Sequence, residues 1–330
     1  MRFFDQEAVR TLSPWPDLIN ALKEMFIRGC EAPERDHYSV GSDGKTLLVM
    51  CAWEKDRYVG TKLVTIFPSN AKLSLPSVYG VYVLIDGVTG QPEAILDGGE
   101  LTARRTAATS ALAASYLARE NAEIFTMVGT GRLSRNLIEA HASVRPYKKI
   151  WIWGRRYERA KEVAAQCAEI GLPVSAAEDL ESSVRRSDVV SCATLSHEAL
   201  VKGAWLRRGT HIDLVGAFKP SMRETDGEVW RKASLAIVDT HEGAVSDAGD
   251  IILAEADGVP AFRRVAGDLA TLLRAGCSGR KHGEEVTIFK SVGASIEDLA
   301  AASFIAGRHN SPSTRMREAS AIPQATDRLI

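Results

Sequence analysis

The pattern of apolar and polar residues changes near residue 120. Before this point the apolar residues come in short runs rich in β-forming residues: "TLLVMCAW", "GTKLVTIFP", "YGVYVLID" and "GQPEAILD". The last two runs are joined by the turn sequence "DGVTG". Runs of this length with hairpin turns between them predict a small antiparallel or mixed sheet.

After residue 120 the apolar runs alternate with segments of helical periodicity. The runs "EIFTMVG", "KKIWIW", "SDVVSCAT", "THIDLVG" and "SLAIVD" have the length of buried strands, whereas "RLSRNLIEAHAS" and "YERAKEVAAQCAEIG" have the spacing of amphipathic helices. Such alternation is typical of a parallel sheet that helices cover on both faces. The sequence therefore predicts an α/β protein with a Rossmann-type doubly wound sheet beside a smaller α+β domain.

Two further helices connect these parts. The alanine- and leucine-rich segment "GGELTARRTAATSALAASYLARE" predicts a long helix between them, and "SIEDLAAASFIAG" predicts a helix that leaves the nucleotide fold and packs back on the first part. We place one domain in residues 1–118 with 300–330, and the other in residues 119–299. The polar tail after about residue 308 is expected to be partly loose.

Composition and charge narrow the class of protein. The chain has 330 residues, of which 45% are hydrophobic and 25% charged, and a formal net charge of −1. These values suit a two-domain globular protein with a small-molecule partner and give no reason to expect a nucleic-acid or membrane partner. The amino terminus lacks the apolar core of a signal peptide, and the five scattered cysteines form no C-x-x-C pair. We therefore expect a cytoplasmic protein with reduced thiols and no metal site.

The segment "TMVGTGRLSRN" follows a predicted strand and opens a predicted helix. Gly129 and Gly131 would keep this turn tight and bring backbone amides close to a pyrophosphate at the helix amino terminus. Ser134 replaces the third glycine of the G-x-G-x-x-G pattern. Alone, the segment could be an ordinary strand-to-helix turn. The next strand at the expected distance favours a dinucleotide site.

The end of the second strand, "IWIWGRR", lacks the acidic residue that normally binds the ribose hydroxyls. Arg155 and Arg156 stand there instead, and an arginine can bind a 2′-phosphate through paired hydrogen bonds. The sequence therefore predicts NADP(H), with Arg155 as the first candidate, Arg156 as the second, and NAD(H) as the alternative cofactor. Either arginine could also be a solvated residue at the start of the next helix.

Taken together, "GTKLVTIFPSN", "LDGGELTARRTAATSALAASYLA", "VGTG", "VGAFKPSMRETD" and "IFKSVGASIEDLAAA" resemble the ornithine cyclodeaminase/μ-crystallin family, in the same order and over about residues 30–305. The resemblance implies an amino-terminal substrate and dimerisation domain, completed by the carboxy-terminal helix, around a Rossmann domain. It also implies a homodimer and a substrate in which an imine lies next to a carboxylate. Members include ornithine cyclodeaminases, alanine dehydrogenases and reductases of cyclic ketimines.

The same resemblance implies roles for single residues. Lys62 matches the active-site lysine, Arg105 the arginine that binds the substrate carboxylate, and Arg35 a second carboxylate-binding arginine. Ser77 matches a substrate contact and Thr106 a cofactor contact. The remaining matches to cofactor-binding positions are Gly129, Thr130, Gly131, Arg155, Thr194, Val215, Lys290 and Ser291.

Two of these roles also have physical support in the sequence. Lys62 is the lone cation of an apolar strand, which is costly unless the ammonium is paired or used, although an edge lysine could reach water. Arg105 lies near the start of the predicted long helix, where the guanidinium and backbone amides could hold a carboxylate together.

Departures from the cyclodeaminase pattern favour a reductase. The aspartate that manages protons in that branch aligns with Phe218, a neighbouring lysine aligns with Met222, and another acidic position aligns with Leu48. Asp213 and Glu224 lie nearby but are shifted along the chain. We interpret the chain as an NADPH-dependent reductase of Δ1-pyrroline-2-carboxylate, and of Δ1-piperideine-2-carboxylate, that forms L-proline and L-pipecolate.

Three alternatives stay open at this point. The first is an ornithine cyclodeaminase with relocated acid groups, and the second is an alanine dehydrogenase-like enzyme that uses ammonia. The third is a binding protein in the manner of μ-crystallin. Lys62 and Arg105 argue against the third, because a carrier of an apolar ligand gains little from two cations in its pocket.

Overall fold

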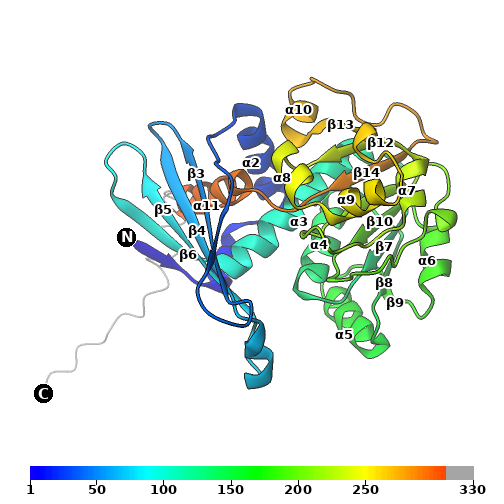
Figure 1. The fold of residues 1–330 in the computed structure, drawn as a ribbon, viewed down its shortest axis with the longest axis horizontal. Helices are drawn as coiled ribbons and strands as arrows, with labels where there is room; N and C mark the ends of the chain where they lie inside the picture. The colour runs from blue at the N-terminus through cyan, green and yellow to red at the C-terminus, as the bar shows by residue number, and fades with distance from the viewer. Residues whose placement is uncertain (310–330) are drawn as a thin grey trace, which may run out of the picture.

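The computed structural model describes residues 1–309 and contains two sheets separated by helices (Figure 1). The first sheet has the strand order β1-β6-β5-β4-β3-β2, in which every neighbouring pair is antiparallel except β1 and β6. Its strands are β1 (Arg2–Phe4), β2 (Asp36–Ser39), β3 (Thr46–Glu54), β4 (Tyr58–Ile66), β5 (Val78–Asp86) and β6 (Pro92–Asp97).

The strands of this first sheet alternate between a buried and an outer face. Met50, Lys62 and Tyr82 are cross-strand neighbours on β3, β4 and β5, and all three are buried. Leu63, the next residue of β4, points to the other face and is partly exposed. Because side chains alternate with a period of two, Lys62 must point toward the helices that cover the inner face.

The second sheet has eight parallel strands in the order β13-β12-β14-β11-β10-β7-β8-β9. The order reverses between β7 and β10, and in such sheets ligands bind outside the carboxyl ends of the strands at this switch point. The strands are β7 (Ile124–Val128), β8 (Lys149–Trp153), β9 (Val174–Ala176), β10 (Val189–Cys192), β11 (His211–Leu214), β12 (Ala233–Val238), β13 (Val265–Asp268) and β14 (Val286–Lys290).

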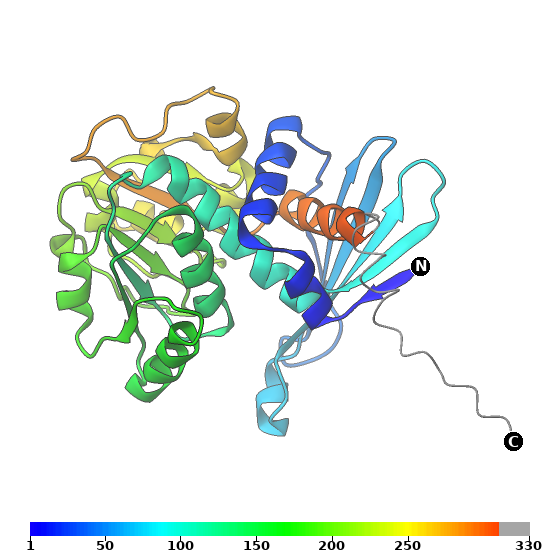
Figure 2. The ribbon, with the colours of Figure 1, turned by 180° about the vertical axis from the view of Figure 1, so that it is seen from behind.

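Helices lie on both faces of the second sheet (Figures 1 and 2). They are α4 (Arg132–Val144), α5 (Tyr157–Ala168), α6 (Leu180–Arg186), α7 (Gly227–Lys232), α8 (His241–Ser246), α9 (Gly249–Ala256) and α10 (Leu269–Leu273). Short 3-10 helices are η1 (Pro68–Leu73), η2 (Gly203–Trp205) and η3 (Phe262–Arg264).

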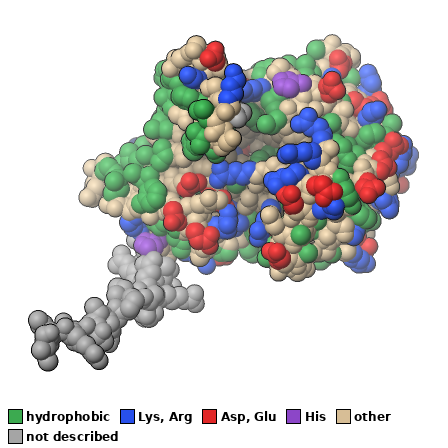
Figure 3. Space-filling model, turned by 90° about the horizontal axis from the view of Figure 1, so that it is seen from below, with side chains coloured by type: hydrophobic (Ala, Val, Ile, Leu, Met, Phe, Trp, Pro, Cys, Tyr) green, Lys and Arg blue, Asp and Glu red, His purple; other side chains and the backbone are tan. Residues whose placement is uncertain are grey.

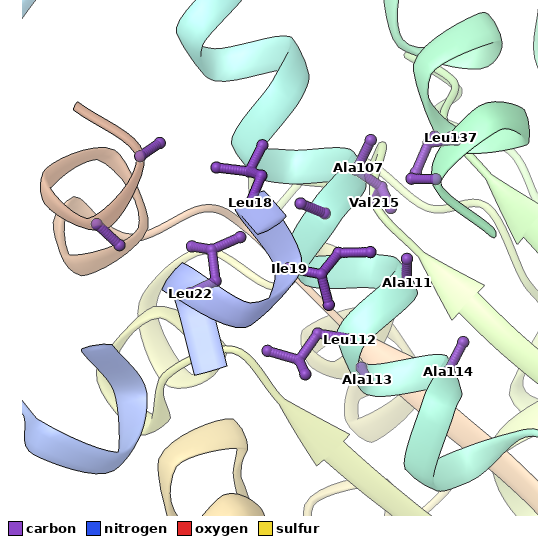
Figure 4. Close-up of a cluster of buried hydrophobic side chains, with 14 of the residues drawn as sticks. Leu18, Ile19, Leu22, Ala107, Ala111, Leu112, Ala113, Ala114, Leu137 and Val215 are labelled. Atoms are coloured by element: carbon purple, nitrogen blue, oxygen red, sulfur yellow. The ribbon is translucent and has the colours of Figure 1, made fainter. Parts of the chain in front are cut away.

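Four more helices fill the space between the sheets: α1 (Gln6–Leu12), α2 (Trp15–Arg28), α3 (Gly98–Leu117) and α11 (Ser295–His309). The helix α3 contacts strands of both sheets and is buried over most of its length. Its alanines let α2 and α4 approach closely, and Leu18, Ile19, Leu22, Ala107, Ala111, Leu112 and Leu137 form one apolar cluster there (Figure 4).

The predicted fold class is confirmed: a doubly wound parallel sheet stands beside a smaller α+β part that a carboxy-terminal helix completes. The predicted strands are all present, but five strands were missed: β1, β2, β9 and β13, which have only three or four residues, and β14, of which only the end was singled out as part of a family motif. The predicted domain limits stay a prediction, and α11 begins at Ser295, before the predicted return at residue 300. The predicted loose tail lies outside the described residues. Within residues 1–309, no helix combines the length and apolar character needed to span a bilayer.

Candidate active site

Lys62 and Arg105 share one buried carboxylate. The Lys62 ammonium donates a hydrogen bond to Oδ2 of Asp298 over 2.6 Å, and Nε of Arg105 donates to Oδ1 of the same residue over 2.9 Å. All three side chains are buried. Strand β4, helix α3 and the first turn of α11 thus place both predicted cations around Asp298.

Two further carboxylates lie close to these cations. Glu297 forms an ion pair with Nη1 of Arg105, whereas its Oε1 is buried without a hydrogen-bond partner among the described residues. Asp239 follows β12, and its Oδ2 accepts hydrogen bonds from the Ser291 hydroxyl and the backbone amides of Val292 and Gly293. The amide of Thr240 donates to its Oδ1. Asp239 therefore fixes the segment between β14 and α11.

Burial is the largest single influence on the pKa values of Lys62, Arg105 and Glu297. It lowers the pKa of Lys62 to about 8, although Asp298 opposes the shift. Burial also acts to lower the pKa of Arg105, but Asp298 and Glu297 together raise it above its ordinary value. For Glu297, burial raises the pKa to about 7 against the opposing effect of Arg105. Lys62 and Glu297 can therefore both exchange protons near neutral pH.

Gly293 brings the two predicted carboxylate-binding arginines together. Nη2 of Arg35 donates a hydrogen bond to the carbonyl oxygen of Gly293 over 2.6 Å. Nε of Arg35 lies 3.7 Å from a carboxylate oxygen of Asp247. A Cβ on Gly293 would stand 2.7 Å from Nη1 of Arg105. The residue also has a φ of +82°, a conformation that L side chains rarely adopt. Glycine is therefore required here for both reasons.

A cavity of about 270 Å³ lies at this junction and is lined by residues of both parts, including Arg35, His37, Met50 and Asp247. Met50 is the cross-strand neighbour of Lys62, so the cavity reaches the row of residues that contains the lysine. Figure 3 shows basic side chains gathered around the hollow between the two parts. The lining combines Arg35 and His37 with three carboxylates, those of Glu34, Glu242 and Asp247, and the volume suits a small polar ligand.

The turn after β7 has the features of a dinucleotide-binding turn. Gly129 has a φ of +121°, and a Cβ there would stand 2.6 Å from the carbonyl oxygen of Ala193, so only glycine fits. Gly131 caps the amino terminus of α4, and a Cβ on it would meet no atom within 4 Å. The open space at this helix amino terminus fits the pyrophosphate of a dinucleotide.

Arg155 and Arg156 follow β8 and are exposed. Within residues 1–309, neither side chain has an ion pair or a hydrogen-bond partner, unlike Arg159 one turn later, which pairs with Glu162. The side chain of Thr130 lies against Gly154, where a Cβ would stand 2.6 Å from it. The two free guanidinium groups therefore stand near the predicted adenosine end of the cofactor.

The other predicted cofactor positions gather at the same sheet edge. Thr194 follows β10 and Val215 follows β11, where it lies beside Ala107 in Figure 4. The ammonium of Lys290 is buried 3.3 Å from Asp250, and the Ser291 hydroxyl donates to Asp239. Both of these side chains are engaged within the protein. Their cofactor contacts, like those of the other positions, stay predictions.

Comparison with known proteins settles the family. The profile of the ornithine cyclodeaminase/mu-crystallin family matches residues 5–313. A Δ1-pyrroline-2-carboxylate reductase of Paracoccus denitrificans is 35% identical over 88% of this chain and 92% of its own. The chain belongs to the ornithine cyclodeaminase/mu-crystallin family. The predicted resemblance is thereby confirmed, and the chain is an oxidoreductase of this family.

Two solved structures of the family resemble the whole chain. The Thermococcus litoralis Δ1-pyrroline-2-carboxylate reductase in complex with NADH and L-proline has a TM-score of 0.88 and 31% identity, over 94% of this chain and 97% of that one. An archaeal alanine dehydrogenase dimer with bound NAD has a TM-score of 0.86 and 30% identity, over 93% and 96% of the two chains. This chain thus shares its fold with two proteins whose reactions differ from each other, so the fold alone does not identify the reaction.

The two acids near Phe218, the position of the cyclodeaminase aspartate, form hydrogen bonds within the protein. Asp213 is completely buried and accepts a hydrogen bond from Ser191 beside His141. Glu224 is also completely buried and accepts from the Thr194 hydroxyl and the amides of Thr194 and Gly216. Burial and the nearby Asp250 raise the pKa of Glu224 to about 7. Glu224 thus ties together the loops after β10 and β11, a role that the sequence did not indicate.

The structure places Arg105 differently from the sequence argument. Arg105 is the eighth residue of α3, which begins at Gly98. The backbone amides around it are already bonded within the helix, so the expectation that amides assist Arg105 is wrong. Thr106, its neighbour on α3, is buried. Ser77 precedes β5 and lies five residues before Tyr82, the cross-strand neighbour of Lys62. Along an extended strand, five residues place Ser77 about 16 Å from Tyr82.

Sequence reasoning missed Asp298, Glu297 and Asp239. The available signal was the acidic pair in "SIEDLAAASF", but acids in the first turn of a helix are common because they favour its dipole. The contact of Asp298 with Lys62, 236 positions away, and the ion pair of Glu297 with Arg105 show where these acids act.

Proposed function

We propose that this chain is an NADPH-dependent reductase of cyclic ketimines, above all Δ1-pyrroline-2-carboxylate, with Δ1-piperideine-2-carboxylate as a second substrate. The products are L-proline and L-pipecolate. The observation that carries the proposal is the pair of buried cations on Asp298. One of these cations, Arg105, also lies against Gly293, three residues beyond the end of β14. The names of the relatives support the same reaction.

Each residue has a distinct role in this proposal. Arg105 binds the substrate carboxylate, with Arg35 as the second donor, and the two converge at Gly293. Lys62 donates a proton to the imine nitrogen or stabilises its charge, and Asp298 holds the ammonium in place. Because these groups are buried, their charges act on the substrate with little screening by water.

A nicotinamide dinucleotide fits the edge of the second sheet. Gly129 permits the tight turn, and the open space at Gly131 lies at a helix amino terminus. When bound, the cofactor supplies the hydride. Arg155, which has no ion-pair partner in the described part of the chain, would hold a 2′-phosphate with Arg156 beside it. This is the basis for proposing NADP(H) over the NAD(H) that the two similar structures contain.

Ornithine cyclodeamination is less well supported. It requires a carboxylate near the reacting amine, and the aligned position holds the half-buried Phe218. Asp213 and Glu224 are buried and hydrogen-bonded within the protein. An alanine dehydrogenase-like activity stays a second candidate because one of the similar structures is an alanine dehydrogenase.

We also propose a cytoplasmic homodimer. Helices α2, α3 and α11 lie on the inner side of the first sheet, toward the second sheet, and the outer side carries apolar residues such as Leu63 and Tyr79 (Figures 1 and 2). The similar alanine dehydrogenase is described as a dimer. All five cysteines are free, which suits a reducing compartment.

The substrate class is tested with purified protein and a panel of substrates. We expect rapid loss of NADPH absorbance with Δ1-pyrroline-2-carboxylate and Δ1-piperideine-2-carboxylate and none with pyruvate plus ammonia. Activity with ornithine and NAD alone would refute the reductase assignment. Activity that depends on ammonia would instead identify a reductive aminase.

Substitution of Lys62 tests its role within the same assay. Lys62→Met removes the proton donor and should lower kcat by about 10²–10⁴-fold, with a smaller change in KM. The pKa of Lys62 is about 8 in the free protein and a bound carboxylate raises it, so the wild-type kcat should fall only above about pH 8, where the ammonium loses its proton. Lys62→Arg keeps a charge that does not titrate and should remove this fall. The exposed Lys55, changed to Met, serves as the control; equal kcat for Lys62→Met and Lys55→Met would contradict the role.

A further inference from the structure

The buried cluster at the domain junction has more carboxylates than cations. Lys62 and Arg105 face Asp239, Glu297 and Asp298, and each of the five residues is at most 4% exposed. If all five groups are ionised, the cluster has a net charge of −1 before any substrate arrives. An uncompensated buried charge is costly, so one carboxylate is under pressure to take up a proton.

The hydrogen bonds identify which carboxylate this is. Asp298 has a cation on each oxygen, and Asp239 accepts hydrogen bonds from four donors. Glu297 has Arg105 on one oxygen only, and its Oε1 is completely buried without a partner among the described residues. Its carboxylate form is thus the least stabilised of the three.

Substrate binding makes this imbalance larger. Under the proposed function, the ligand brings a carboxylate to Arg105, the same guanidinium that Glu297 now neutralises. A second buried negative charge beside Glu297 would repel it directly. A proton on Glu297 would remove that repulsion and leave the charge of Arg105 to the ligand.

We propose that Glu297 takes up one proton from solvent when the substrate carboxylate binds to Arg105, and that it is therefore a positioning residue that adjusts the charge of the substrate site. The inference rests on the proposed function. No covalent bond changes: the proton adds to the Glu297 carboxylate and returns to solvent when the product leaves.

The direction of the pH effect follows from the groups that face Glu297. These are Arg105 on α3, Asp239 after β12, Asp298 on α11 and Lys62 on β4. Burial raises the pKa of Glu297 to about 7, and an added anion would raise it further. Below pH 7 the proton is already present, so KM is flat; above pH 7 it must be acquired, and KM rises up to about tenfold per pH unit.

The decisive measurement is the number of protons taken up on ligand binding. We choose pyrrole-2-carboxylate as the probe, because its ring nitrogen is not basic and cannot itself take up a proton. Its binding to the NADP⁺-loaded enzyme is measured by calorimetry at pH 7.5 in buffers of different ionisation enthalpy. We expect proton uptake by the wild type and a reduction of about 0.7 proton per ligand in Glu297→Gln.

Three variants separate Glu297 from its neighbours. Lys62→Arg stays charged and should keep the uptake that belongs to Glu297. Glu284→Gln lies at an exposed site that pairs with Arg208 and should behave as the wild type. In Glu297→Gln, which keeps the shape of a protonated glutamate, the KM for the imine should stay nearly flat between pH 7 and 8.5.

Each outcome decides the matter. The inference is overturned if the wild type binds pyrrole-2-carboxylate without proton uptake, and this result does not require a folded Glu297→Gln. It is also overturned if a folded Glu297→Gln takes up as many protons as the wild type. If the imine is reduced while either result holds, the proposed function stands and this inference alone fails. If the enzyme neither binds pyrrole-2-carboxylate nor reduces the imine, the proposed function fails first.

Discussion

The choice between the two nicotinamide cofactors depends on single charges after β8. Arg155 and Arg156 are exposed and, within residues 1–309, unpaired, although α5 that follows is rich in ion pairs. Exposed charge alone is weak evidence, because many surface arginines only meet water. The lack of an acidic neighbour is more informative, because a carboxylate at this strand end would repel a 2′-phosphate.

Arg155→Ala should therefore change cofactor preference. Loss of a charge-assisted contact costs about 1.5–3 kcal/mol, so we expect the KM for NADPH to rise about 10–150-fold while the KM for NADH stays nearly constant. Steady-state kinetics with both cofactors measure this. Arg159→Ala, one turn further along α5, is the matched control. An unchanged preference in Arg155→Ala and in Arg156→Ala would exclude both residues as the phosphate site.

At the same scale, the sequence could indicate Lys62 but not its partner. A lone lysine in an apolar strand must be paired or used, and this physical argument holds in the structure. Its partner Asp298 lies 236 positions away on a helix whose acids have a simpler explanation in the helix dipole. Pairing over such a distance depends on the tertiary path of the chain. Local sequence patterns carry no information about that path.

The element that organises the site is the short segment between β14 and α11. Asp239 binds its amides, Gly293 touches both arginines, and α11 then presents Glu297 and Asp298. The sequence "IFKSVGASIEDLAAA" predicts the helix of this segment but not its turn. The positive φ of Gly293 comes from the return of the chain between two sheets, a tertiary requirement.

Gly293→Ala should damage substrate binding more than cofactor binding. The new Cβ would stand 2.7 Å from Nη1 of Arg105 and would adopt a strained conformation, at a cost of about 1–3 kcal/mol in the free energy of unfolding. We expect the KM for the imine to rise at least about tenfold, because the guanidinium must move. Kinetics and thermal unfolding measure the two effects. Gly307→Ala on α11 meets no atom within 4 Å and is the control; a normal KM in Gly293→Ala would contradict the placement of Arg105.

Across the whole molecule, the two sheets contribute different parts of the candidate site. The second sheet offers the dinucleotide site at its switch point, and the first presents Lys62 from its inner face. The alternation of strands and helices predicted the first of these features, because a buried parallel sheet has a clear pattern. The relative placement of the sheets was not predictable, because it depends on contacts of α3 with strands on both sides.

The outer face of the first sheet supports the last prediction, that of a homodimer. Leu63 stands between Val49 and Val81 on this face, opposite to the side that carries Lys62. An exposed apolar sheet face is typical of an interface, and a carboxylate placed in its centre would be desolvated without a partner. Leu63→Asp should therefore convert a dimer into a monomer in light scattering, at micromolar concentrations where the wild type stays dimeric. Ile170→Asp, at an exposed site after α5, should leave the dimer intact. A wild-type monomer would refute the assignment of this face, and a dimer of Leu63→Asp would place the interface elsewhere on the surface.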